Sequence, residues 1–355
     1  MRCTTPTVPH GSRPMTETGP QTVSAALRSA VKILTDTRVP SAAHDARELM
    51  AAALTADSGS TVTPMDLVLR GGDPVPASYM SLVERRAARE PLQFILGTAP
   101  VVGLDLAVGP GVFIPRPETD LLIDWAASRV VDWEQRRRSS PLRASLVPPR
   151  FTVVDFCSGP GTISLGLAHL LTRAGLADRL DLRIIGIELS PTALDYAGRN
   201  LADWRARGDI DARIAVGFHR GDVADAALVT GLGLVAGADL VLSNPPYVPE
   251  GDHDEHVAAA DPEVGADPHE AVYSGADGLE LMRPLAPIIA MACAPHAEIA
   301  VEHDGATGPQ VRELLADAGI VDPVQHRDYA GRDRFVTGTV RRDPGDRGAE
   351  PDRLQ

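Results

Sequence analysis

The sequence of 355 residues contains little cysteine and no long apolar run. Its three cysteines, Cys3, Cys157 and Cys293, lie far apart and lack metal-ligand spacing, which argues against both a disulfide framework and a zinc site. No stretch approaches the roughly 18 consecutive apolar residues that a membrane span needs, and the first residues lack the apolar segment of a secretory signal. These absences predict a cytoplasmic protein with reduced thiols, no bound metal and no membrane contact.

Basic residues are also few. The chain has 34 lysine and arginine residues against 48 aspartate and glutamate residues, and its net charge is −14. Proteins that grip nucleic acid through its phosphates usually carry a basic patch, so the composition argues against stable nucleic-acid binding. Hydrophobic residues make up 44% of the chain, which is enough for buried cores in about two domains.

The apolar pattern divides the chain into segments of different character. Residues 21–98 carry apolar side chains at helical spacing, which predicts a small N-terminal domain of short helices. Residues 99–116 alternate apolar side chains among glycine and proline, which predicts a hairpin connector. Residues 134–150 are charged and aperiodic and predict a surface insertion, while residues 1–20 and 341–355 predict a disordered leader and tail.

Strands and helices alternate along the rest of the chain. The clearest apolar strands are Phe151–Phe156, Leu182–Leu189 and Ala238–Pro246. Such alternation predicts a mostly parallel sheet with helices on both faces. Ligands bind such sheets outside the carboxyl ends of the strands, so we expect the chemistry where these strands end.

The ends of the first two strands favour a ligand site. A glycine-rich turn follows the first strand, where Gly159 and Gly161 let the backbone approach a ligand and the next helix offers free N–H groups. A turn that serves only packing would look the same. Glu188 ends the second strand, where an acidic side chain can accept hydrogen bonds from both hydroxyls of a ribose. An exposed charge is the alternative, but the two features together favour binding.

The third strand ends in the more specific sequence Asn244-Pro245-Pro246-Tyr247. A planar amide nitrogen is a poor nucleophile, so an enzyme that alkylates it must hold it tightly and turn its lone pair toward the electrophile. The side-chain oxygen of Asn244 and the carbonyl of Pro245 can accept both N–H bonds of an NH₂ group. The prolines fix the turn, and the Tyr247 ring can pack on the planar group.

Together these motifs resemble class I S-adenosylmethionine-dependent methyltransferases that modify planar NH₂ groups. Further segments narrow the resemblance to the release-factor glutamine methyltransferase family (HemK/PrmC), and the match covers about residues 25–340. These segments are Arg89–Asp120, with the signature Ile-Pro-Arg-Pro-Glu-Thr at Ile114–Thr119, Ala266–Leu285 and Asp328–Gly338. The two late segments separate this family from DNA methyltransferases with the same tetrapeptide.

The resemblance implies a fold and a role for each motif residue. Residues 117–340 would form the α/β methyltransferase domain, a Rossmann-like seven-stranded sheet whose last strand is antiparallel, and residues 21–98 would dock the substrate. Residues implied to bind the cofactor S-adenosylmethionine are Asp155, Cys157, Ser158, Gly159, Pro160, Gly161, Glu188, Asp222, Val223 and Asn244. Residues implied to contact the substrate are Arg116, Glu118, Asn244, Pro245, Pro246 and Tyr247, of which Asn244, Pro245 and Tyr247 are implied to be catalytic.

The chain departs from the family pattern at three places. The family usually has glycine where Cys157 stands, which predicts a stiffer or displaced cofactor loop. A later Glu-Ile-Gly strand of the family reads Val301-Glu302-His303-Asp304 here, and the usual Glu-Pro is Asp267-Pro268. These differences indicate a diverged member of the family.

The resulting hypothesis is methylation of a glutamine side-chain nitrogen in a protein, by resemblance in the Gly-Gly-Gln loop of peptide chain release factors. We expect the protein to act as a monomer. One alternative is a nucleic-acid adenine or cytosine amino methyltransferase, because the same tetrapeptide serves those substrates. Others are a diverged member that methylates another protein and a cofactor-sensing protein without turnover.

The segment 252–270 concentrates acidic residues and contains three histidines, but no lysine or arginine. The histidines lack the regular spacing of metal ligands, so a metal site is a weak interpretation. The simpler interpretation of this segment is a solvated loop. Beside the catalytic turn, the segment would also repel phosphates and attract a basic protein loop, which favours a protein substrate over nucleic acid.

Overall fold

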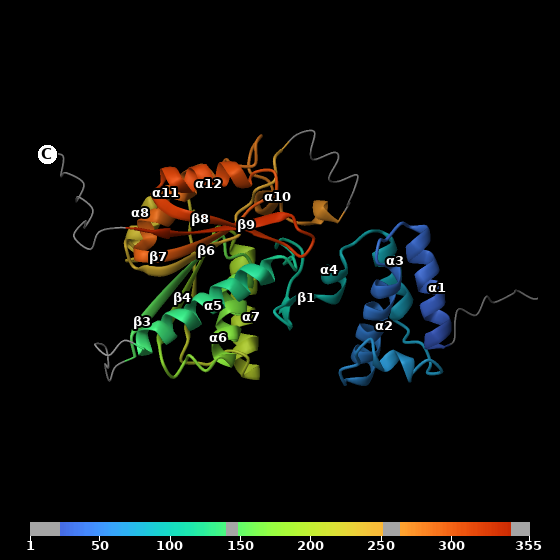
Figure 1. Cartoon of the computed structure of the whole chain (residues 1–355). Coiled ribbons are helices and arrows are strands. Elements are labelled where there is room, and N and C mark those ends of the chain that lie inside the picture. Colours follow the sequence, from blue (N-terminus) through green and yellow to red (C-terminus); the bar gives the residue numbers. More distant parts are fainter. Residues whose placement is uncertain (1–21, 140–147, 251–262, 342–355) are drawn as a thin grey trace, which may run out of the picture. The chain divides into compact units, whose positions relative to one another are not determined.

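The computed structural model describes residues 22–139, 148–250 and 263–341, and it divides the chain into two compact units (Figure 1). The first unit is residues 1–95 and the second is residues 96–355. This division lies close to the boundary expected at residue 98. The expected leader, almost all of the tail and the middle of the expected insertion lie outside the described residues.

Short helices build the first unit. They are α1 (Val23–Asp36), α2 (Ala42–Ser58), the 3-10 helix η1 (Asp66–Val68) and α3 (Tyr79–Ala87), and α4 (Leu92–Leu96) leads into the second unit. Thr22 caps α1 by accepting a hydrogen bond from the amide of Ala25 (3.3 Å). Asp45 of α2 and Arg86 of α3 form a buried ion pair (2.7 Å). Removing either partner would leave a buried charge without this ion pair, which is strongly destabilising.

A seven-stranded sheet forms the centre of the second unit, in the order β5-β4-β3-β6-β7-β9-β8. Neighbouring strands are parallel except that β9, the last strand in the chain, is antiparallel to both β7 and β8. This topology confirms the predicted fold class. The strands are β3 (Arg150–Phe156), β4 (Asp181–Glu188), β5 (Ala215–Arg220), β6 (Ala238–Ser243), β7 (Cys293–Glu302), β8 (Ile320–Arg327) and β9 (Asp333–Val340).

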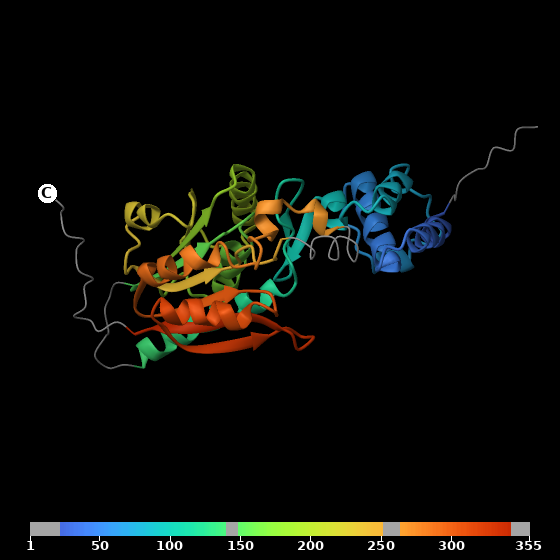
Figure 2. The same ribbon diagram turned by 90° about the horizontal axis from the view of Figure 1, so that it is seen from above.

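Helices cover both faces of this sheet, and each face has its own apolar core (Figure 1). On one face lie α5 (Thr119–Arg138), α6 (Thr162–Arg173) and α7 (Pro191–Arg207). On the other lie α8 (Ala226–Gly231), α11 (Met282–Ala292) and α12 (Gly308–Asp317). Figure 2 looks onto the second face, with α11 and α12 in orange. No helix in the described part of the chain is long and apolar enough to cross a membrane.

The segments that flank α5 differ in part from expectation. Strands β1 (Thr98–Val101) and β2 (Leu104–Ala107) pair antiparallel and form the expected hairpin. The expected surface insertion, however, begins too early, because residues 134–138 are the last turns of α5. Glu134 is buried there and pairs with Arg137 (2.9 Å). Arginines in the last turn also favour a helix through its dipole, so this charged run is helical.

Candidate active site

A cavity of about 650 Å³ lies at the carboxyl ends of the central parallel strands. Its wall includes Cys157 after β3, Glu188 at the end of β4, Asp222 after β5 and Asn244 after β6. The volume lies in the range of small-molecule sites, and the place is where open parallel sheets bind their ligands. Four strands far apart in the sequence therefore contribute to one site.

Most of the predicted site residues lie on this wall. They are Arg116, Cys157, Ser158, Gly159, Pro160, Glu188, Asp222, Val223, Asn244, Pro245, Pro246 and Tyr247. Three others, Asp155, Gly161 and Glu118, do not line the cavity. Gly161 has a φ of 94°, a backbone conformation that strains any residue with a side chain, so this turn requires glycine. Glu118 instead pairs with Arg332 (3.4 Å).

Glu188 holds in place the loop that follows β3, residues 157–161. One carboxylate oxygen accepts a hydrogen bond from the amide of Gly159 (2.8 Å), and the other accepts one from the amide of Ser190 (2.8 Å). Each carboxylate oxygen has two acceptor positions, so a ribose could still bind to the remaining ones. Glu188 therefore has a structural role that the sequence did not reveal, and its ligand contact stays a prediction.

Asn200 of α7 supports the same loop from behind. Its side chain is buried, donates to the carbonyls of Pro160 (3.0 Å) and Ala107 (3.1 Å), and accepts from the amide of Ala107 (2.8 Å). It thereby joins the loop to the β1–β2 hairpin. Sequence reasoning missed this residue, although an asparagine among apolar positions at helical spacing, with Ala197 and Trp204, was a usable signal.

Asp155 lies beneath the loop, fully buried. One carboxyl oxygen accepts hydrogen bonds from the amide (3.1 Å) and hydroxyl (2.6 Å) of Ser164, while the other has no partner among the described residues. Burial raises the pKa of Asp155 to about 7, and the charge of Glu188 adds to the shift, although the bonds from Ser164 oppose it. Asp155 thus anchors the start of α6 and does not form part of the cavity surface.

This raised pKa predicts a pH-dependent stability. An unfolded aspartate ionises near pH 4, so the stabilisation from the protonated native carboxyl is present below pH 4 and is lost as pH rises through about 7. Asp155→Asn keeps a neutral acceptor for Ser164 and removes this dependence. We expect the melting temperature of the variant minus that of the wild type, measured without ligand, to increase by about 5 °C from pH 4.5 to pH 8. A constant difference across this range would contradict the assignment.

Cys157 adopts the left-handed backbone conformation that favours glycine, with φ of 61°. This geometry explains why the family usually has glycine here. The following residues of the loop are held by the hydrogen bond from the Gly159 amide to Glu188. The Cys157 side chain packs against the apolar core on one face of the sheet and lies on the cavity wall. Burial raises the pKa of its thiol, so the group is a neutral packing element at neutral pH.

Substitutions at Cys157 test this strain. A β-branched side chain is least tolerated at positive φ, so we expect Cys157→Val to lower the free energy of unfolding by about 1–2 kcal/mol. Cys157→Gly relieves strain but makes the unfolded chain more flexible, and we expect a change below about 1 kcal/mol. Urea unfolding of the three proteins measures both differences. Equal stability of the valine and glycine variants would rule out backbone strain as the constraint.

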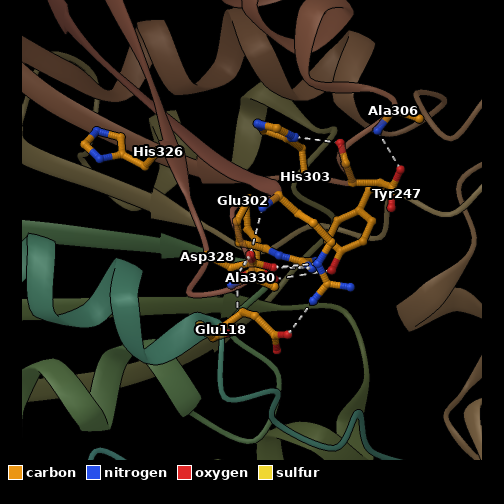
Figure 3. A network of polar contacts seen from close by, with 12 residues as sticks. Glu118, Tyr247, Glu302, His303, Ala306, His326, Asp328 and Ala330 are labelled. Carbon is orange, nitrogen blue, oxygen red and sulfur yellow. Dashed lines mark hydrogen bonds and ion pairs between the residues drawn. The ribbon is translucent and has the colours of Figure 1, made fainter.

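The turn Asn244–Tyr247 is hydrogen-bonded to residues far away in the chain. The Asn244 amide nitrogen donates to the hydroxyl of Thr119 (3.3 Å), which donates to one oxygen of Glu302 (2.9 Å). The Tyr247 hydroxyl donates to the other Glu302 oxygen (3.3 Å). Figure 3 shows Tyr247 and Glu302 in one network with Glu118 and Asp328. Sequence reasoning assigned no role to Thr119 or Glu302 at the site.

Charges in this network are mutually dependent. Burial raises the pKa of Glu302 to about 7, while hydrogen bonds from Thr119 and Tyr247 and the charge of Arg334 oppose the shift. Burial also raises the pKa of Tyr247, and the charge of Glu302 contributes in the same direction. Tyr247 therefore keeps its proton and acts as a donor to Glu302.

Asp267 organises the signature segment at the edge of the cavity. Its carboxylate pairs with Arg116 and accepts a hydrogen bond from the amide of Ile114 (2.9 Å). The Arg116 guanidinium also lies over the Phe113 ring, 5.1 Å from its centroid. Most of the acidic segment 252–270 lies outside the described residues, but Asp267 within it is buried and paired with Arg116, so it adds little to any solvent-facing acidic surface.

The wall suits S-adenosylmethionine on three counts. A side chain at Gly159 would extend into open space, so the glycine leaves room at the wall. The Ser158 hydroxyl is buried and has no hydrogen-bond partner in the described chain, which leaves it available to a ligand. Glu188 has acceptor positions to spare. These residues, with Asp222 and Val223 farther along the wall, would hold the cofactor.

Comparison with known proteins gives consistent results. The family model described as the PrmC N-terminal domain matches residues 25–97. A release factor glutamine methyltransferase of Corynebacterium glutamicum is 39% identical over 89% of this chain and 98% of its own length. Proteins of the same name from Streptomyces coelicolor (36% identical, 88% of this chain, 96% of theirs) and Mycobacterium tuberculosis strain H37Rv (35%, 89% and 91%) are also similar.

These matches include both units of the chain, and they agree with the sheet topology and with the motifs on the cavity wall. The chain therefore belongs to the release factor glutamine methyltransferase family, a family of S-adenosylmethionine-dependent methyltransferases.

Proposed function

We propose that this protein methylates the side-chain nitrogen of a glutamine in peptide chain release factors, in their Gly-Gly-Gln loop. The observation that carries the proposal is the turn Asn244-Pro245-Pro246-Tyr247 on the cavity wall at the end of β6. The names of the similar bacterial proteins support the same substrate. S-adenosylmethionine, when bound, supplies a methyl group activated by its sulfonium.

The turn is suited to bind and activate an amide. Asn244 offers its side-chain oxygen and Pro245 its backbone carbonyl, and together they accept both N–H bonds of the glutamine NH₂ group. These acceptors hold the nitrogen lone pair in position, and they bind more strongly as the nitrogen gains positive charge during the reaction. Positioning and electrostatic stabilisation therefore account for most of the catalysis.

Tyr247 contributes its ring and not its hydroxyl. The hydroxyl donates to Glu302, so the ring is fixed on the wall, where it can pack on the planar amide. The methylated nitrogen is acidic and loses its extra proton readily, so water can accept it. No strong general base is needed for this chemistry.

We further propose that the N-terminal helices contribute to docking of the release factor, because a protein substrate needs contacts beyond the methylated side chain. The test is incubation with labelled S-adenosylmethionine, in parallel with purified release factors, duplex DNA and ribosomal RNA. We expect label in the release factor alone. Label in nucleic acid with none in protein would replace the proposal by the amino-methyltransferase alternative.

A further inference from the structure

A single buried carboxylate connects the two polar ends of the catalytic turn. Glu302, at the end of β7, is 1% exposed and does not line the cavity. Its two oxygens accept hydrogen bonds from different residues, Thr119 at the start of α5 and Tyr247 in the turn. Neither side-chain contact is part of the strand pairing, because the backbone pairing of β6 with β7 ends at Ser243 and Val301.

The direction of these hydrogen bonds fixes the orientation of the Asn244 amide. In the ionised form of Glu302, which the charge of Arg334 favours, the carboxylate only accepts, so the single Thr119 proton points to Glu302 and a lone pair of the hydroxyl faces Asn244. A lone pair favours the amide nitrogen of Asn244 and repels the amide oxygen. The oxygen is therefore turned away from Thr119 and is left free to accept from a ligand.

The same carboxylate positions the aromatic ring. The Tyr247 hydroxyl donates to Glu302, and Arg334 lies close enough to interact with both groups. The positive charge of Arg334 favours the ionised form of Glu302 in this buried place. Two features of the turn, the face of the amide and the position of the ring, thus depend on one ion.

We propose that Glu302 and Thr119 are positioning residues for methyl transfer: Glu302 orients the Thr119 hydroxyl, which presents the Asn244 side-chain oxygen to the substrate amide, and Glu302 also holds the Tyr247 ring. This inference rests on the proposed function. It adds that the nearly isosteric Thr119→Val, which removes only the hydroxyl of a residue on the cavity wall, impairs the reaction although Thr119 is not assigned to bind cofactor or substrate.

The experiment compares Thr119→Val, Thr119→Ser and the wild type in steady-state assays with a release factor. We expect the valine variant to lower kcat about tenfold or more, with the KM for the release factor and the cofactor Kd changed less than threefold. The serine variant retains the hydroxyl and is expected to keep at least half of the wild-type kcat. Thr172→Val is the matched control, because the Thr172 hydroxyl contacts Ala168 and Asp211, which do not line the cavity.

Glu302→Gln provides a second variant, because it removes the charge while it keeps the size of the side chain. The oxygen of its amide group can accept from only one of the two partners, so we expect a lower kcat. Wild-type kcat in both Thr119→Val and Glu302→Gln would overturn the inference, as would failure of serine to restore a defect caused by valine.

A readout that is independent of activity separates this inference from the proposed function. The side-chain NH₂ signals of Asn244, assigned by their loss in Asn244→Ala, report its hydrogen bond in nuclear magnetic resonance spectra. We expect these protons to exchange with water at least fivefold faster in Thr119→Val than in the wild type or in Thr119→Ser. If the wild type methylates no release factor, the proposed function fails, and an unchanged exchange rate would separately refute the positioning role.

Discussion

Asn244→Ala is expected to lower kcat for methylation by about 10²–10³-fold or more, the effect of removing one positioned charge-stabilising group from an active site. The variant loses the side-chain oxygen that accepts one N–H bond of the substrate, while the Pro245 carbonyl remains. Cofactor binding is expected to weaken less than tenfold, because the loop after β3 and Glu188 are unchanged. Labelled-methyl assays measure the rate, and isothermal titration measures cofactor affinity.

Folding is the control for this prediction. Asn244 is partly exposed and its side chain donates a 3.3 Å hydrogen bond to Thr119, so the variant is expected to melt within a few degrees of the wild type. An Asn244→Ala protein with full activity would refute the mechanism. Equal losses of activity and of cofactor affinity would show that Asn244 acts through the cofactor alone.

Glu188→Ala is expected to raise the Kd for S-adenosylmethionine by about 10²-fold, equivalent to about 2.7 kcal/mol. Two effects add up: the ribose loses its charged acceptor, and the amides of Gly159 and Ser190 lose the carboxylate that holds the loop. We expect the Michaelis constant for the cofactor to rise while kcat at saturating cofactor falls less than tenfold.

Asp195→Ala is the matched control for Glu188, because it removes an exposed acid from α7, the helix that follows Glu188, and Asp195 does not line the cavity. We expect this control to bind the cofactor as the wild type does. An unchanged Kd in Glu188→Ala would place the ribose elsewhere on the wall.

The central strands were predictable from the sequence, but both edge strands were not. β3 and β6 lie between two layers of helices, so nearly all of their residues are buried and most of them are apolar, and they stand out as runs. β5 and β8 form the edges of the sheet, and nearly all of their residues are partly buried or exposed. Their sequences therefore lack a continuous apolar run or a clear alternation, which are the signals that reveal a strand.

The site was predictable where one local motif carries the chemistry. The turn at Asn244 and the acid at Glu188 follow apolar strands, and parallel strands bring their carboxyl ends to the same edge. The hydrogen bond from Thr119 to Glu302 spans 183 residues of sequence, and no local pattern indicates which polar residues meet across such a separation. Positioning residues of this kind emerge only once the strands are placed in space.

The central claim is that the methyl acceptor is the glutamine of the Gly-Gly-Gln loop in a release factor. The most direct measurement is tandem mass spectrometry of a purified release factor after incubation with this protein and S-adenosylmethionine, with the Asn244→Ala protein in parallel. We predict one added methyl group on the side-chain nitrogen of that glutamine with the wild type and none with the variant. A methyl group on another residue, or an unmodified release factor, would contradict the claim.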